Sequence, residues 1–311
     1  MVPVTLQPRR AQQRDGLVEV DPGPPGPGNA GTGTSPGPGT GTAQGNVLAR
    51  LRDRSAQRPR FDPGLAGGLR AWLEDGAGAL VESRGDDAPP LHLGPRLLLG
   101  QADQNSSSRQ RSSRQREDYP SQVVTSYLVH ALFRQLVTTG SVGDPLTDAL
   151  DALGLHPNRA GLVRHVGRLN RRARSELRAE LTNQIGHLRE LTPHFAPGWL
   201  PRTDDRVAIP LAGGRVVLCG VFDLLVGAPD PGQASLCALQ LTSGGPWAFA
   251  RTALHYLALL ETLRHGNPPF RLGLLDSAVG RYVIEDVQQE HLRAMTSHLV
   301  TRLDLLAGAD D

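Results

Sequence analysis

The chain has 311 residues, of which 39% are hydrophobic and 4% aromatic, and its formal charge is +2 at pH 7. All 33 of its Lys-or-Arg positions are arginine, which excludes P-loop NTPases, pyridoxal-phosphate enzymes and any mechanism with a lysine base. The total charge is too close to zero to indicate a nucleic-acid partner by itself.

Residues 1–62 are predicted to form a disordered tail. Between Asp21 and Gly45, 15 of 25 residues are Gly or Pro, and such a segment cannot bury enough surface to offset its ordering entropy. The tail ends in a basic arm, Leu48 to Arg60, with five arginines and one acid. A second polar, low-complexity segment at residues 101–118 is predicted to be a disordered, solvated loop.

Apolar residues at helical spacing predict helices over residues 65–82, 121–137 and 144–153. A long helix is expected to follow from Asn158 to Glu190, because Pro193 and Pro197 stop it. Residues 63–198 are therefore predicted to be a helical extension of the fold. Its last helix, 158–190, is expected to serve as the first element of a core formed by residues 199–311.

The pattern changes after Trp199, where short runs rich in β-forming residues are separated by turn residues. These runs predict strands at 207–209, 215–226, 236–242, 270–275 and 281–284, with helices at 247–264 and from about 286 to 306. This order predicts an α/β fold with one mixed sheet between layers of helices.

Cys219 and Cys237 both lie in apolar stretches and are predicted to be buried thiols in a reducing cytoplasm. No apolar run reaches about 18 residues, so no transmembrane helix is expected. Residues 1–17 lack the apolar segment of a secretory signal. The sequence thus predicts a cytoplasmic protein without a membrane partner.

Two polar positions interrupt the apolar strands. Asp223 lies in a run that is apolar on both faces, and a buried carboxylate must be paired, metal-bound or protonated. Gln240 and Thr242 share one face of the next strand. A turn at residues 229–232 is expected to pair these two strands and to bring Asp223 near Gln240.

A helix acid is a further candidate. Glu180 follows Leu162 by 18 residues, which is five full turns at about 3.6 residues per turn, so it is predicted to share the apolar face that looks toward the sheet. Glu176 falls at the edge of that face. The alternative for Glu176 is an exposed ion pair with Arg172 at i,i+4.

A helix acid, a strand with Gly-x-x-Asp, a strand with acid-x-Lys-x-Gly and a helix, in this order, resemble the PD-(D/E)XK nuclease superfamily, especially its RecB-like branch. The matching residues here are Gly220-Val221-Phe222-Asp223 and Gln240-Leu241-Thr242-Ser243-Gly244. Residues 258–271 and 283–287 also resemble actinobacterial proteins assigned to that superfamily. The resemblance covers roughly residues 199–306 and, more weakly, the helices from Ser121 onward.

The resemblance implies roles for individual residues. In active members the aspartate and the strand acid hold Mg²⁺, and the lysine assists the attacking water. Asp223 matches the aspartate, Gln240 the strand acid, Thr242 the lysine and Glu180 the helix acid. Metal ligands would therefore be Asp223 and Glu180. With Gln240 and Thr242 in place of an acid and a lysine, the resemblance implies a degenerate site with no cofactor or only weakly bound Mg²⁺.

Arginines are concentrated between His156 and Glu190, with eight arginines against three glutamates. Arg164, Arg168 and Arg172 follow at steps of four, and Arg171 lies beside them, so one helix face could track phosphates. The alternative is a solvated helix face.

Three functions follow from these observations. The first is a nuclease-like protein without hydrolytic activity that binds DNA or a protein partner. The second is a Mg²⁺-dependent DNA nuclease, endo- or exonuclease, with a variant site made of Glu180, Asp223 and Gln240. The third is a structural subunit that does not contact nucleic acid.

Overall fold

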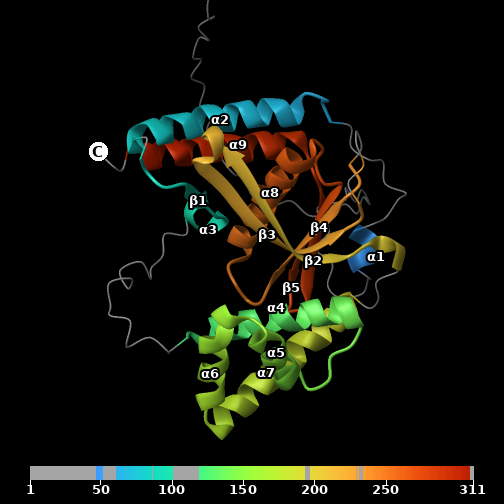
Figure 1. Ribbon diagram of the computed structural model, residues 1–311. Coiled ribbons are helices and arrows are strands. Elements are labelled where there is room, and N and C mark those ends of the chain that lie inside the picture. Colours follow the sequence, from blue (N-terminus) through green and yellow to red (C-terminus); the bar gives the residue numbers. More distant parts are fainter. Residues whose placement is uncertain are drawn as a thin grey trace, which may run out of the picture. The chain divides into compact units, whose positions relative to one another are not determined.

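The computed structural model describes residues 47–51, 61–85, 87–100, 119–192, 197–228, 230 and 234–308. The expected loop at 101–118 and most of the expected tail lie outside these residues. The fold is α/β, with a mixed six-stranded sheet flanked by helices, as the sequence predicts (Figure 1).

The helices that precede the main strands are α1 (Val47–Leu51), α2 (Leu65–Arg84), α3 (Pro95–Leu98), α4 (Ser121–Thr139), α5 (Pro145–Gly154), α6 (Ala160–Arg168) and α7 (Arg171–Leu191). A three-residue strand, β1 (Leu91–Leu93), lies between α2 and α3. The strands that follow are β2 (Arg202–Leu211), β3 (Val216–Val226), β4 (Cys237–Thr242), β5 (Arg271–Asp276) and β6 (Arg281–Asp286), with α8 (Trp247–His265) after β4 and α9 (Gln289–Ala307) after β6.

Three of the strands form an antiparallel unit in which β3 pairs with both β2 and β4. Helix α8 then crosses over so that β5 lies parallel to β4, and β6 returns antiparallel to β5. The short β1 pairs in parallel with the beginning of β3, on the edge that β4 occupies farther along. The paired positions on this edge end at Leu218 for β1 and begin at Leu224 for β4, so the two neighbours diverge around residues 219–223.

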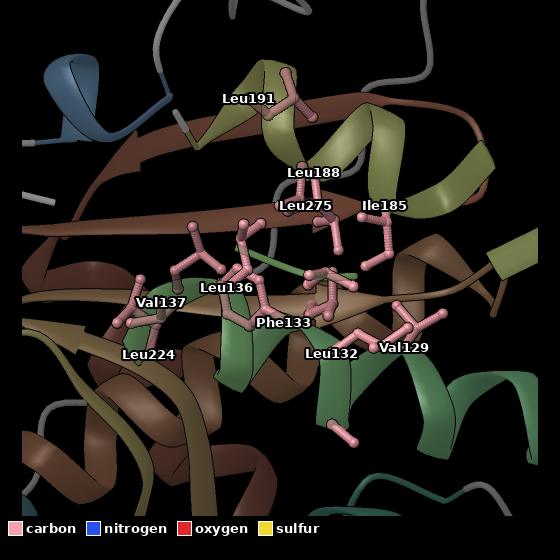
Figure 2. Packing of buried hydrophobic residues seen from close by; sticks show 14 of the residues in the cluster. Val129, Leu132, Phe133, Leu136, Val137, Ile185, Leu188, Leu191, Leu224 and Leu275 are labelled. Carbon is pink, nitrogen blue, oxygen red and sulfur yellow. The ribbon is translucent and has the colours of Figure 1, made fainter. Parts of the chain in front are cut away.

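Two apolar clusters cover the two faces of the sheet. One face packs against α4 and α7, and α5 packs on these two helices. Figure 2 shows Phe133 and Leu136 of α4 converging with Leu188 of α7 and Leu275 of β5. The other face packs against α2, α8 and α9. Strand β4 serves both clusters by alternation, because Leu239 belongs to the first and Ala238 to the second.

Gly220 explains how α8 approaches the sheet so closely. A Cβ atom at this position would lie 2.4 Å from Leu257 Cδ2 of α8, so a larger residue would force this leucine to shift. The glycine of the Gly-x-x-Asp sequence therefore has a packing role in this protein.

The single helix expected at 158–190 is two helices, and this expectation was wrong. A short 3-10 helix, Pro157–Arg159, leads into α6, which ends at Leu169 with an extended backbone (ψ 138°). Asn170 then caps α7 by accepting a hydrogen bond from Ala173 N at 2.9 Å. The cap satisfies an N–H group that a helix start leaves unpaired, and it starts a new helix in a new direction.

Residues 47–51 also differ from the expectation, because this part of the predicted tail of 1–62 is helical. Val47 and Leu51 are 1% and 0% exposed and belong to the first apolar cluster. From the region expected to be a helical extension, α2 packs against α9, and β1 joins the sheet.

Candidate functional site

Asp223 lies on β3 directly before Leu224, where the pairing with β4 stops. Each oxygen of its carboxylate contacts a nitrogen atom. Oδ2 accepts a hydrogen bond from Leu241 N at 2.7 Å, and Oδ1 lies 3.4 Å from His130 Nε2 of α4. Pairing of β3 with β4 confirms the expectation that Asp223 lies at the level of Gln240. The residue is only 8% exposed, and these two partners compensate for the water that it loses.

His130 is the partner that the sequence did not reveal. Its Nδ1 lies 2.7 Å from Ser126 O, and its Nε2 faces Asp223, so both ring nitrogens have acceptors. Burial disfavours the charged imidazole, but the charge of Asp223 and hydrogen bonds to Asp223 and Ser126 O outweigh burial and raise the pKa of His130 to about 9. Asp223 and His130 thus form an ion pair at neutral pH. In the sequence, His130 stands alone in an apolar helix, which is not a specific signal.

A second pair of opposite charges lies one helical turn farther along. Arg134 of α4 contacts Asp204 of β2, whose backbone has a positive φ of 54°. The two strands therefore present acids, and α4 presents the bases that neutralise them.

Gln240 and Thr242 do not join this pair. Alternation along β4 places them on the side of Ala238, which packs with α8, whereas His130 approaches Asp223 from α4. Thr242 Oγ1 accepts a hydrogen bond from Gly245 N at 3.2 Å. Among the described residues, Gln240 Oε1 is buried without a hydrogen-bond partner. Thr242 therefore shapes the turn after β4, and Gln240 offers one neutral oxygen.

Glu180 is exposed on α7 and does not face the sheet, so the expectation that it looks inward was wrong. The helical count from Leu162 fails because the chain breaks between α6 and α7, and the two helices have separate rotations. Within α7 the buried residues are Leu181, Gln184, Ile185, Leu188 and Leu191. Glu176, at the edge of the predicted face, forms the exposed ion pair with Arg172 that was the alternative for it, at 2.8 Å.

Hydrogen bonds connect Glu180 to the end of β4 instead. Gln184 Nε2 donates to Glu180 Oε1 at 2.6 Å, and Ser277 Oγ donates to Gln184 Oε1 at 2.6 Å. Ser277 Oγ also lies 3.2 Å from Thr242 O. This chain of contacts docks α7 on the β5–β6 turn. No group of three or more His, Cys, Asp or Glu side chains suited to a metal ion occurs within the described residues.

A separate polar cluster lies where α8, β6 and α9 meet. Glu285 accepts hydrogen bonds from Arg251 Nη2 at 2.6 Å and from His255 at 2.5 Å, and the His255 ring stacks on His291. Burial opposes ionisation of Glu285, but these hydrogen bonds outweigh it and lower the pKa of Glu285 to about 2. The side chains of Arg251 and His255 are therefore both engaged in hydrogen bonds to Glu285.

The predicted phosphate-contacting arginines, Arg164, Arg168, Arg171 and Arg172, are all exposed. They surround the junction of α6 and α7, which we call the arginine corner. Arg174 adds a guanidinium to the same place and donates to Gly167 O at 3.3 Å. The first turn of α7 contains no acidic residue.

No protein-family model matches the chain, and no curated protein matches it. Within the described residues, no helix is both long and apolar enough to cross a membrane.

Proposed function

We propose that this protein is a nuclease-like α/β protein that binds duplex nucleic acid through the arginine corner without cleaving it. The order of α7, β3, β4 and α8 is the order on which the resemblance to the PD-(D/E)XK superfamily rests. The observation that carries the binding proposal is the exposed set of arginines around the α6–α7 junction.

The arginine corner is unfavourable for the helix that holds it. Arg171, Arg172 and Arg174 lie in the first turns of α7, at the positive end of its macrodipole, where each cation costs about 0.3–1 kcal/mol at low ionic strength. Bound phosphates would offset this repulsion, because they would meet both the guanidinium groups and the positive helix end. A purely solvated face gains nothing from this placement.

The absence of cleavage in this proposal rests on Asp223. A catalytic aspartate must turn an oxygen to Mg²⁺. Here Oδ2 accepts a hydrogen bond from Leu241 N, and Oδ1 faces the charged imidazole of His130, which repels a cation. Glu180 lies at the surface and Gln240 carries no charge, so neither supplies the second carboxylate.

Salt-dependent binding to a short DNA duplex tests the proposal. If Arg164, Arg168, Arg171 and Arg172 each neutralise one phosphate, log K falls by about 3.6 per tenfold rise in salt, at about 0.9 per phosphate. Arg172 then exchanges its exposed partner Glu176 for a phosphate. Replacing all four by Gln should lower the affinity and remove most of this slope, whatever the DNA sequence. A charge-matched control replaces Arg84, Arg96, Arg206 and Arg293 by Gln and should change the slope by less than the value for one phosphate, about 0.9.

Circular dichroism must first show that both variants are folded, because arginine stems also cover apolar surface. If the folded corner variant binds as the wild type does, or the wild type does not bind at low salt, a structural or protein-binding role replaces the proposal. If the wild type cleaves DNA in Mg²⁺ and Asp223→Asn abolishes this, the protein is a nuclease with a variant site.

A further inference from the structure

Helix α1 is bound to the sheet like a peptide ligand. It has only five residues, and an isolated helix of this length is not stable in water, so its conformation depends on what it packs against. Val47 and Leu51 are four positions apart on one helix face, and both are fully buried.

The surface under α1 is shaped for this segment. At Gly273 of β5, a Cβ atom would lie 3.2 Å from Leu51 Cδ1, so a larger residue would crowd the leucine. The thiol of Cys237 on β4 donates to Leu51 O at 3.2 Å. Strands β4 and β5 therefore provide both the space for Leu51 and a donor for its carbonyl oxygen.

Polar contacts around Arg50 add specificity. Arg271 Nη1 donates to Arg50 O at 2.6 Å, while its Nε donates to Asp286 at 2.7 Å. Arg50 Nη1 in turn donates to Tyr282 Oη at 2.8 Å, and its guanidinium carbon lies 5.6 Å from the Tyr282 ring centroid. The last carbonyls of a helix lack partners within the helix, and here the sheet supplies them.

We propose that this surface of β4, β5 and β6, which we call the α1 groove, is a recognition site for short helical peptides. The peptide that fits it has two apolar residues four positions apart and an arginine directly before the second. Val47–Leu51 is the intramolecular occupant, and a segment of this pattern from another protein competes with it. Because α1 belongs to the same chain, its effective concentration at the groove is on the order of millimolar, so only a tighter or abundant competitor displaces it.

The test uses the full-length chain and a fluorescent synthetic peptide of residues 44–54. Leu51→Asp in the protein should expel α1, because it places a charge in a fully buried apolar site. Fluorescence anisotropy should then show peptide binding at least tenfold tighter than to the wild type, whose groove is filled. Arg50→Ala in the protein keeps both apolar anchors, loosens α1 less, and should give a smaller gain.

Peptide variants identify the site. The peptide with Leu51→Asp should not bind, and the peptide with Arg50→Ala should bind about tenfold more weakly. Tyr282→Phe in the Leu51→Asp protein should weaken the unaltered peptide but not the Arg50→Ala peptide.

Equal peptide affinity for the wild type and the folded Leu51→Asp protein would overturn the proposal, as would no binding to the latter at millimolar peptide. If Leu51→Asp does not fold, the Arg50→Ala protein decides, and unchanged affinity there also overturns it. DNA binding by the arginine corner is a separate readout and does not enter this result.

Discussion

The ion pair between His130 and Asp223 should make the free energy of unfolding fall at alkaline pH. The pKa of His130 rises from 6.5 to about 9 on folding, which corresponds to about 3 kcal/mol at about 1.4 kcal/mol per pH unit. Because the His130 side chain is 28% exposed, solvent screening makes this an upper limit. The folded-state pKa is the higher one, so the stabilisation is complete below pH 6.5 and is lost as pH rises through about 9.

A double-mutant cycle with His130→Gln and Asp223→Asn isolates this term. Urea unfolding should give a coupling free energy of about 2–3 kcal/mol at pH 6.5 that falls below about 0.5 kcal/mol at pH 10. Asp223→Asn keeps an acceptor for Leu241 N, so it removes mainly the charge. The cycle also cancels groups that titrate independently of the pair.

The exposed pair of Arg172 and Glu176 is the matched control. Its coupling should stay below about 0.5 kcal/mol at both pH values, because the pair is solvated and arginine does not titrate in this range. A His130–Asp223 coupling that is equal at pH 6.5 and pH 10 would refute the assignment of a charged His130.

Three more measurements probe the buried acids and the site. Calorimetry should find Mg²⁺ binding no tighter than about 1 mM, and a micromolar site that Asp223→Ala removes would contradict the occupied carboxylate. Gln240→Glu with Thr242→Lys should not create Mg²⁺-dependent cleavage, since the charged His130 still faces Asp223; cleavage by this variant would show that the pair opens. Glu261 of α8 is fully buried, and burial raises its pKa. Its oxygens lie 3.1 Å from His265 Nε2 and 3.6 Å from Arg264 Nη1, but among the described residues neither oxygen accepts a hydrogen bond. Its stabilising contribution is therefore complete at acid pH and lost as pH rises through the raised pKa, so Glu261→Gln should gain about 1 kcal/mol at pH 7 and none near pH 3, and a loss at pH 7 would contradict this.

Most main-chain elements were predictable because their signals are local. The apolar run of β3 and the helical spacing of α4 and α8 predict those elements within a few residues. Strand β1 was not predicted, because three residues are too few to show a β-strand alternation. Its pairing partner is also distant: Leu91 pairs with Val216, 125 positions later. The break between α6 and α7 was not predicted, because the helix-forming residues on both sides are a stronger signal than the single capping residue, Asn170.

The site was predictable only in part. Asp223 stood out because a carboxylate interrupts an apolar strand, and such a group needs a partner. Its partner His130 comes from a helix whose position depends on tertiary packing, which no spacing in the chain reveals. Glu180 was misplaced because a rotation carried across a helix break has no meaning.

The packing of α2 against α9, which are far apart in the sequence, has a consequence for biosynthesis. Helix α2 packs against α9, with Gly76 beside Val300. The last residue of α2, Arg84, and the first residue of α9, Gln289, are 205 positions apart in the sequence. At about 5–20 residues per second on the ribosome, α2 waits about 10–40 s for its partner. Helices α4 to α7 contact one another within a short stretch and can assemble during this interval. Because the layer of α2, α8 and α9 closes only once α9 has left the ribosome, the nascent chain exposes leucines of α2 to chaperones until then.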